Sequence, residues 1–588
     1  MAKGLANPNP VFVDSDSLAA LGWKDLWAAF VPLTVYGQQV KASATPFLPG
    51  QEDELQAIWS QLEQDLADWS ADDARRLHED LQNWPNVLDA LALLTRPQGS
   101  LSPKHLLSLK QFAYRGFHLA RAEGFPGTFT WTDTGRWQGL LTTLGQGDSP
   151  SFAVVHVAGA DFSEHVRAHA EALRQLGAVT RDRDAKWQER LRQRPHRDGQ
   201  VVLSLPEQAD LAAALKQDPG ARWLRDTPFE SVFELLPSAQ MEQAAVTVAL
   251  CQEELTRAAD VALSALTQQL LRDLGRWEQA VADITALDLR LARRQLAEAW
   301  GGSVPRLGNG LHLLEGAVHP LVAQRLRQQG RSYVPLDFGP QAGANALFGS
   351  NMGGKTVAMS LLAVCQLCAQ FGLPVPAESF QTRLFPVVRF CASAETDLSS
   401  GLSSFGSEVT RLAQAWQDVK QSQFGLLCLD EPARSTNPIE GEALVVGLVR
   451  AAAELGRDSV LLLATHFSAV LYEPAVIKFR VRGLQPGWRQ AQANGSASAQ
   501  PAPEVVREAG NAIAKVKETL ATAADPVRAY ATPGNAIEAL AQWMDYRVER
   551  VEGAGEFLTE ALPVAKWLGL PPAVLRESEQ FLQRRRES

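Results

Sequence analysis

The sequence predicts an α/β domain that follows a mainly α-helical region with long helical arms. Three observations support this fold class. Apolar residues recur at helical spacing before residue 300, no proline occurs between Pro237 and Pro305, and after Trp300 short β-like runs alternate with glycine turns and one strong helix. Apolar residues three and four positions apart form one face of a helix, whereas strands that alternate with helices are typical of an α/β sheet.

The length of 588 residues exceeds what one hydrophobic core usually organises, so we expect about three to four structural units. Residues 491–503 (AQANGSASAQPAP) are small and polar and include proline, which is typical of a flexible linker. The predicted segments are a helical core (residues 1–160), helical lever arms with a small β-containing tip (161–300), an α/β domain (301–485), a flexible linker or insert (486–540), and a C-terminal segment that completes the α/β domain and adds helices (541–588).

The proline-free stretch before residue 305 predicts one long helix or two helices in line. Roughly sixty residues at about 1.5 Å each would reach ~90 Å, so we interpret the stretch as a lever arm. The alternative is a kinked pair of helices that meet near Gly275. Residues 162–191 also have a helical pattern and could run antiparallel to the arm. Two β-like runs, residues 201–205 and 231–236, predict a small sheet at its tip.

The composition is that of a folded, soluble protein, with 46% hydrophobic and 21% charged residues. No apolar run approaches the ~18 residues that span a bilayer, and the start, MAKGLANPNPVFVD, lacks the apolar stretch of a signal peptide, so we expect a cytoplasmic location. The five cysteines are an odd number in apolar segments, which suits a reducing compartment. Cys365 and Cys368 form a lone CxxC, and we interpret it as part of a buried helix rather than a metal or redox site.

The net charge of −10 argues against attraction of the whole chain to nucleic acid, because non-specific affinity for DNA comes from Lys and Arg side chains. Residues 180–199 are nevertheless locally basic, with seven Lys or Arg against four acids. This segment fits an ordinary solvated helix tip and also fits a DNA-binding patch. The candidate DNA contacts are Arg181, Arg183, Lys186, Arg190, Arg192, Arg194 and Arg197.

The segment GSNMGGKT has the pattern of a phosphate-binding loop (P-loop), and it lies between a strand-like run (ANALF) and an apolar helix (TVAMSLLAVCQLCAQ). Its glycines let backbone N–H groups face the phosphates, the Lys355 ammonium neutralises their oxygens, and the Thr356 hydroxyl is expected to ligate Mg²⁺. The predicted nucleotide-binding residues are Gly349, Ser350, Asn351, Met352, Gly353, Gly354, Lys355 and Thr356.

Two further apolar strands end in polar residues. The run FGLLCLDEP delivers Asp430 and Glu431 at its carboxyl end, which is where an open α/β sheet places its active site. We expect Asp430 to hold Mg²⁺ and Glu431 to act as the general base toward the attacking water. The run SVLLLATHF ends in His466, whose imidazole could sense the γ-phosphate or orient the water.

The motifs NMGGKT, SSGLSSFGSEV, LDEPARSTNP and ATHF, in this order and spacing, resemble those of the MutS-family ATPases, a branch of the ABC-type fold. The resemblance covers about residues 300–588 and the helical first half in outline. It implies ATP as substrate with Mg²⁺, an ABC-type ATPase domain, and segments GAVHPLV and YVPLDFG that flank the adenine.

The resemblance also implies a homodimer, or a heterodimer with a related subunit, in which each chain offers its signature segment to the partner's nucleotide. Ser403 and Ser404 would then contact the partner's γ-phosphate in trans, and the alternative is a plain helix N-cap. The dimer seam would contain Arg434, Ser435, Thr436 and Asn437.

Several departures from the mismatch-repair pattern leave open which macromolecule the protein acts on, which we call its client. The helical core is expected to begin within the first ~20 residues, which leaves no room for a mismatch-reading domain. The variants DEPARSTNPIEG and WMDYRVERVEG are similar to MutS-like ATPases that reactivate adenosylcobalamin-dependent lysine aminomutases. We therefore expect an ATP-driven switch that acts on DNA through its arms, with reactivation of an aminomutase as the alternative. A non-hydrolysing scaffold is a third, weaker interpretation.

Overall fold

The computed structural model describes residues 10–587, apart from 97–100, 123–132, 146–148, 155–156, 159, 197–198, 309–312, 350–353, 393–403, 485–543, 553–560 and 568–569. The chain forms two compact units. One unit contains residues 1–32, 37–74 and 288–588, and the other contains residues 33–36 and 75–287. The predicted linker at 486–540 lies outside the described residues.

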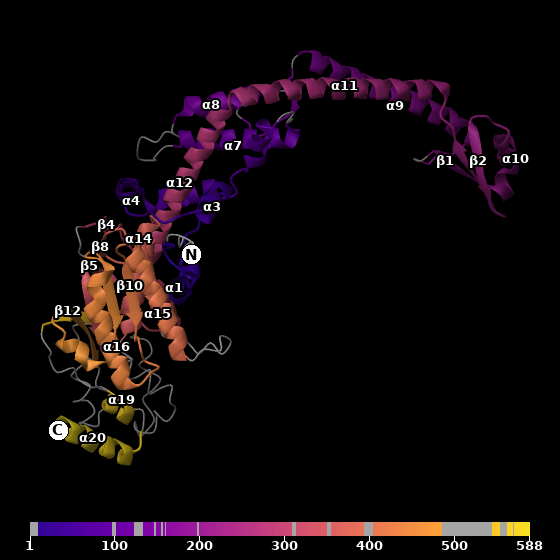
Figure 1. Ribbon diagram of the computed structural model, residues 1–588. Helices are drawn as coiled ribbons and strands as arrows, with labels where there is room; N and C mark the ends of the chain where they lie inside the picture. The colour runs from indigo at the N-terminus through magenta and orange to yellow at the C-terminus, as the bar shows by residue number, and fades with distance from the viewer. Residues whose placement is uncertain are drawn as a thin grey trace, which may run out of the picture. The chain divides into compact units, whose positions relative to one another are not determined.

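The first unit is built on a six-stranded sheet in the order β13-β12-β7-β11-β10-β9 (Figure 1). Neighbouring strands in it are parallel except β12 and β13, which pair antiparallel. This arrangement agrees with the predicted α/β fold class. The strands are β7 (Gly343–Phe348), β9 (Val388–Cys391), β10 (Leu426–Asp430), β11 (Val460–Ala464), β12 (Val476–Leu484) and β13 (Met544–Val551).

Both faces of this sheet are covered, which explains why its central strands are continuously apolar. In β10, Cys428 belongs to a core cluster with helix α14 (Lys355–Gln370), while Leu427 and Leu429 belong to a second cluster with α16 (Pro438–Ala451). The described residues of α14 are almost entirely buried, including Cys365 and Cys368. Burial raises the pKa of both thiols, so they remain protonated core residues, in agreement with the interpretation of the CxxC.

A smaller four-stranded sheet lies in the same unit, in the order β4-β8-β5-β6. Its strands are β4 (Arg306–Leu307), β5 (Leu313–Ala317), β6 (Leu336–Phe338) and β8 (Ser379–Thr382). The remaining helices of the α/β part are α13 (Pro320–Gln328), α15 (Ser404–Gln421), α19 (Ala561–Trp567) and α20 (Pro572–Glu587), with short 3-10 turns at Ala452–Leu455 and Ser468–Tyr472.

The first helices of the chain pack onto this α/β unit rather than into a separate helical core. Helices α1 (Ser15–Ala20), α2 (Trp23–Ala29) and α4 (Glu52–Asp68) bury Leu26 and Trp59 in the same cluster as α14. The predicted boundaries at residues 160 and 300 therefore do not coincide with the two compact units. The reason is that the apolar faces of these early helices are covered by distant parts of the chain, which periodicity alone does not identify.

The second unit contains a helical core around Phe112. This ring lies against Tyr36, Trp84, Trp137 and Trp277. The helices of the unit's core are α5 (Ala71–Leu81), α6 (Leu88–Leu94), α7 (Pro103–Arg121) and α8 (Thr134–Thr143), with the short α3 (Val35–Ala42) at its border.

Replacing Gly116 in this core with alanine is expected to destabilise the second unit by roughly 1–3 kcal/mol, because overpacking forces neighbouring groups to move. A Cβ at Gly116 would lie 2.3 Å from Cε3 of the buried Trp137 ring. The melting transition measures the loss. Gly139→Ala, in α8, is the control because a Cβ there meets nothing within 4 Å. Equal melting temperatures for the two variants would contradict the packing argument.

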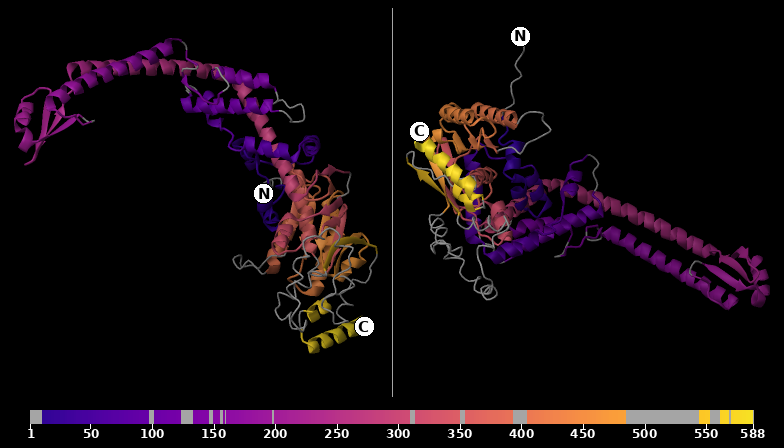
Figure 2. Two further views of the ribbon diagram at one scale, coloured as in Figure 1. Left: turned by 180° about the vertical axis from the view of Figure 1, so that it is seen from behind. Right: turned by 90° about the horizontal axis from the view of Figure 1, so that it is seen from below.

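The arms of the second unit are two long helices, α9 (Ala160–Leu191) and α11 (Ala239–Arg272), which run side by side in all three views (Figures 1 and 2). This confirms the antiparallel arrangement expected for residues 162–191. The proline-free stretch is interrupted: α11 ends before Asp273 and α12 (Leu274–Trp300) follows at once. The structure thus has the broken pair that was the alternative near Gly275, and not one continuous helix.

A three-stranded sheet of order β1-β3-β2 joins the far ends of α9 and α11. Strands β1 (Gln200–Ser204) and β3 (Glu230–Leu235) match the two predicted runs, whereas β2 (Ala221–Asp226) and helix α10 (Leu205–Lys216) were not predicted. Among the described residues, no helix is both long enough and apolar enough to span a bilayer.

Candidate functional site

The P-loop begins directly after β7 and leads into α14. Gly349 and Gly354 have φ angles of 151° and 84°, and Gly354 is the residue that precedes the helix. At Gly354 the backbone conformation favours glycine, and an added Cβ would make a tight contact of 3.1 Å with the Tyr546 ring of β13. Ser350, Asn351, Met352 and Gly353 lie outside the described residues, so their predicted phosphate contacts remain predictions.

The residues that follow the loop meet the acids at the end of β10. The Lys355 ammonium donates to the Gly349 carbonyl over 2.9 Å and lies 3.3 Å from Oε1 of Glu431. The Thr356 hydroxyl donates to Oδ2 of Asp430 over 2.8 Å. Residues more than seventy positions apart in sequence therefore form one cluster at the carboxyl edge of the sheet, as the spacing of the motifs predicted.

The acids of this cluster are largely removed from solvent. Asp430 and Glu431 are 8% and 9% exposed. Burial raises the pKa of the Asp430 carboxyl, and the neighbouring Glu431 carboxylate adds to this, while the hydrogen bond from Thr356 and the charge of Lys355 oppose it. A buried carboxylate beside a hydroxyl is an oxygen-donor set of the kind that Mg²⁺ prefers, so these residues fit the expected ion.

Glu431 lies between two cations. Its Oε1 faces Lys355, and its Oε2 lies 3.3 Å from Nη1 of Arg434, a side chain that is 61% exposed. The residue itself has a φ of 49°, and its N–H donates to the Ala464 carbonyl at the end of β11 over 3.1 Å. A positive φ at a residue other than glycine is uncommon and points to a turn that surrounding contacts hold in place.

His466 follows β11, whose neighbours in the sheet are β7 and β10, so it lies at the same edge as the cluster. Its side chain is exposed, and its ring packs beside Phe467 with centroids 4.4 Å apart. The Thr465 N–H donates to the Leu347 carbonyl over 3.2 Å, which ties this loop to the end of β7. Contact of His466 with a γ-phosphate remains a prediction.

Comparison with known proteins identifies this part of the chain. A sequence model described as MutS domain V matches residues 346–481, which contain the P-loop, the two acids and His466. Residues 346–481 are thus similar to domain V of the MutS family. This agrees with the resemblance that the motifs carry.

The relatives carry two kinds of name. An endonuclease MutS2 of Thermomicrobium roseum is 29% identical over 418 residues, which are 66% of this chain and 50% of that protein. An endonuclease MutS2 of Solidesulfovibrio magneticus is 32% identical over 185 residues, 31% of this chain and 23% of the relative. A DNA mismatch repair protein MutS of Thermus thermophilus is 30% identical over 203 residues, which are 34% of this chain and 24% of that protein. The chain thus matches half or less of the length of these MutS-family relatives.

The MutS-type signature segment is described only in part. Ser403 lies outside the described residues, and Ser404 begins helix α15, with its side chain outside the description. Of the predicted seam, Arg434, Ser435 and Asn437 are exposed and Thr436 is partly buried. The Asn437 side chain caps α16 by accepting from the Ile439 N–H over 3.0 Å. The seam residues therefore lie on the surface, beside the candidate base, where a partner could reach them.

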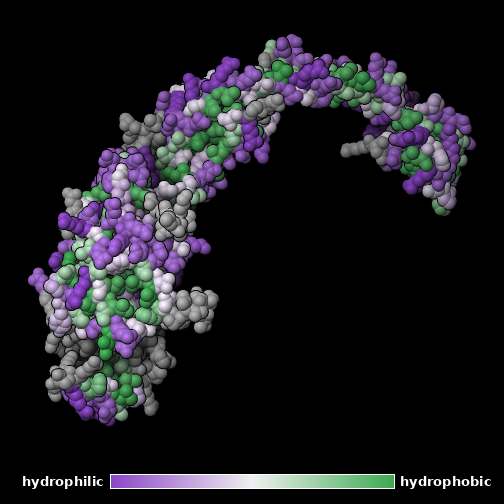
Figure 3. Space-filling model, viewed as in Figure 1, coloured by the Kyte–Doolittle hydropathy of each residue, from purple (hydrophilic) through white to green (hydrophobic). Residues whose placement is uncertain are grey.

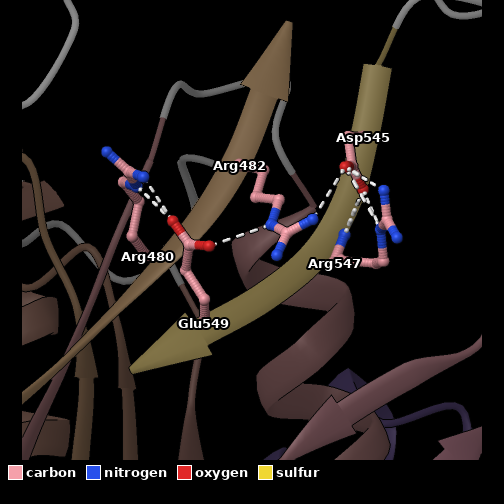
Figure 4. A network of polar contacts seen from close by, with 5 residues as sticks. All are labelled: Arg480, Arg482, Asp545, Arg547 and Glu549. Atoms are coloured by element: carbon pink, nitrogen blue, oxygen red, sulfur yellow. Dashed lines mark hydrogen bonds and ion pairs between the residues drawn. The ribbon is translucent and has the colours of Figure 1, made fainter. Parts of the chain in front are cut away.

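Two residues of the site, Glu408 and Tyr546, lie within the motifs SSGLSSFGSEV and WMDYRVERVEG but had no predicted role. Glu408 of α15 accepts hydrogen bonds from the turn that follows Glu431. Tyr546 of β13 lies against Gly354, and the strand pairing that places it is reinforced by ion pairs (Figure 4). In that network Glu549 accepts from Arg480 and Arg482, while Arg547 and Arg482 both lie near Asp545. The alternation of acids and bases in DYRVERV was the available signal.

The candidate DNA contacts lie at the tip end of α9 and just beyond it. Three of them pair with carboxylates: Arg183 with Asp184 at 2.6 Å, Lys186 with Asp182 at 2.7 Å, and Arg190 with Asp218. Arg181, Arg192 and Arg194 are exposed, and Arg197 lies outside the described residues. The same end of the molecule also exposes Trp223, Leu224 and Phe229, and Figure 3 shows hydrophobic and hydrophilic residues mixed there.

His319, in the segment expected to flank the adenine, is buried, and its Nε2 lies 3.1 Å from the Ser360 hydroxyl of α14. Burial, and to a lesser degree the charge of Arg325, lowers the pKa of the imidazole to about 4. Its contact with adenine remains a prediction.

The stability of the first unit is expected to fall between pH 6.5 and about 4 because of His319. In this window the unfolded chain binds a proton that the folded chain excludes, and a shift of this size corresponds to roughly 3 kcal/mol once pH has fallen through the folded pKa. Melting temperatures measured at pH 7 and pH 5 test this. The variant His319→Gln should lose part of the pH dependence, and an unchanged slope would contradict the assignment.

Proposed function

We propose that the chain binds ATP with Mg²⁺ and hydrolyses it, and that hydrolysis drives a change of conformation. The observation that supports this is the cluster of Lys355, Thr356, Asp430 and Glu431, which contains a phosphate-binding cation, a hydroxyl and carboxylate for the metal, and a base. Lys355 is 4% exposed, so its charge acts on the phosphates with little screening by water.

In the proposed reaction a water molecule attacks the γ-phosphorus, and the bond from that phosphorus to the β–γ bridging oxygen breaks. Glu431 takes the proton from the attacking water, and ADP leaves with the electron pair of the broken bond. Lys355 stabilises the negative charge on the phosphate oxygens. Thr356 and Asp430 would hold Mg²⁺, which when bound neutralises charge on the β and γ oxygens. His466 would orient the water or the γ-phosphate.

For the client we propose DNA, reached through the arms and their tip, with two chains forming the active dimer. The support is that the relatives are named as an endonuclease and a DNA mismatch repair protein, together with the exposed Arg181, Arg192 and Arg194. Ion pairs at Arg183, Lys186 and Arg190 do not argue strongly against this, because such surface pairs are worth about 0–1 kcal/mol and phosphates can replace them.

A protein client is the second candidate, and one observation favours it. The tip exposes Trp223, Leu224 and Phe229, and several of its basic side chains are matched by acids. Exposed aromatic and aliphatic groups are typical of surfaces that contact protein. An adenosylcobalamin-dependent aminomutase is the client that the motif variants suggest, and the dimer would then use closure to open it.

The deciding experiment measures ATP turnover with Mg²⁺ alone, with duplex, branched and mismatched DNA, and with a purified aminomutase from the same genome. Stimulation by DNA that weakens as salt rises supports the first client, because phosphate contacts release counterions. Stimulation by the aminomutase alone supports the second. Failure of every DNA form to bind at low salt would exclude DNA, and absence of turnover under all conditions would overturn the ATPase proposal.

A further inference from the structure

The turn that carries the candidate base is strained in two places. Glu431 and Ala433 have φ angles of 49° and 63°, in the left-handed region, although neither is glycine. Such a conformation costs free energy in a residue other than glycine, and it persists only where its surroundings hold it. The N–H of Glu431 is held by the Ala464 carbonyl. A second contact has to hold Ala433.

Glu408 supplies that contact from another element. One of its carboxylate oxygens accepts the Ala433 N–H, and the other accepts the Ser435 hydroxyl over 2.7 Å. Both oxygens are thus used on a single turn of three residues. Glu408 lies near the start of α15, twenty-five positions before Ala433 in the chain, so the pair of bonds ties this helix to the turn.

From the other side the turn rests on α16. A Cβ added at Gly441 would lie 2.9 Å from the Ala433 carbonyl oxygen and 3.0 Å from the Phe467 ring, so the turn is packed against the helix without a gap. With this side fixed by packing, a displacement of α15 changes the turn through Glu408. Glu431 and Arg434 lie on the same turn as Ala433. Glu431 is two residues before it, and Arg434 is the residue after it.

We infer that Glu408 is a positioning residue that ties helix α15 to the turn bearing Glu431, and so keeps the candidate base in its working geometry. This inference rests on the proposed ATPase function. In the proposed dimer, α15 carries the segment offered to the partner's nucleotide, so Glu408 makes the base sensitive to the partner. Among the described residues, Glu408 bonds to Ala433 and Ser435 of the turn rather than to Lys355 or Thr356, so its effect on turnover passes through the turn.

The test compares Glu408→Ala and Glu408→Gln in the full-length chain. The alanine variant is expected to lower kcat by roughly 10- to 100-fold, because small misplacements of a reacting group have effects of this size. Its KM, and its Kd for a fluorescent ATP analogue, should stay within about twofold, since ground-state binding is unaffected. The glutamine variant should recover most of the rate: its oxygen accepts from Ala433 and its amide donates to the Ser435 hydroxyl.

Thr410→Ala is the matched control, because this exposed α15 side chain donates to the Gly406 carbonyl within its own helix. An unchanged kcat in Glu408→Ala would overturn the inference, as would a joint loss of kcat, ATP affinity and melting temperature, which marks a purely structural role. Hydrogen exchange at the Ala433 amide separates the two proposals. Faster exchange in Glu408→Ala than in Glu408→Gln supports the positioning role of Glu408 even if the original chain shows no turnover. Equal exchange in the two variants excludes that role.

Discussion

Replacing Glu431 with glutamine is expected to lower ATP turnover by roughly 10²- to 10⁴-fold, the range that general-base catalysis contributes. The amide keeps the size of the carboxylate, but its single oxygen can face only one of Lys355 and Arg434, and it cannot take a proton from the attacking water. Binding of ATP should persist, because Lys355, the proposed phosphate-binding residue, is unchanged. Steady-state turnover and the affinity for a fluorescent ATP analogue measure the two quantities separately.

The control is Glu440→Gln, an exposed acid in the first turn of α16, which should hydrolyse ATP at the original rate. If Glu431→Gln retained the original rate, another residue would have to act as the general base. His466 is the next candidate at the same edge of the sheet. Loss of nucleotide affinity in Glu431→Gln would instead indicate that the charge on Glu431 holds Lys355 in place.

The core of the candidate site was predictable because its chemistry is local in sequence. Two local patterns predict a role without reference to the rest of the chain. One is a glycine-rich loop before an apolar helix, and the other is an apolar strand that ends in two acids. The geometry joins them as expected, with Thr356 on Asp430 and Lys355 beside Glu431. Glu408 was not predictable in this way, because its function depends on a turn twenty-five residues later adopting left-handed angles.

The fold was predictable where one periodicity ran without interruption. Helices α9 and α11 follow from apolar spacing over more than thirty residues each. The break at Asp273 was foreseen only as the alternative near Gly275, because the apolar positions continue at helical spacing into α12 and no proline marks the junction. At the tip, Pro206 at the start of α10 is a common helix-start signal, yet several nearby prolines read more simply as loop punctuation.

Arg389 is a charged residue that tertiary contacts keep buried on a strand. Its replacement is expected to destabilise the first unit more than any other substitution proposed for that unit. This arginine lies on the edge strand β9 and is 1% exposed. Its Nε donates to Asp418 of α15 over 2.8 Å. Its other nitrogens donate to the carbonyls of Val11, Phe12 and Val388.

These bonds fasten the beginning of the chain to the sheet, where the Val388 N–H also donates to the Phe12 carbonyl over 2.7 Å. Replacement by methionine keeps the length of the side chain but leaves Asp418 without its buried cation. We expect a loss of roughly 3–5 kcal/mol in the free energy of unfolding, the usual result of breaking a buried ion pair from one side. Calorimetric melting of the first unit measures it.

Arg450→Met is the comparison, because Arg450 makes a similar two-nitrogen contact with Glu473 but is 69% exposed. Water screens that surface pair and can replace it, so the melting temperature should not change measurably. If Arg389→Met melted like Arg450→Met, the carbonyl contacts of residues 11 and 12 would not hold the chain's beginning. Hydrogen exchange at the Val388 amide would then stay slow, since its bond to Phe12 would survive without the guanidinium. Fast exchange at that amide in Arg389→Met alone identifies the arginine as the group that keeps this segment on the sheet edge.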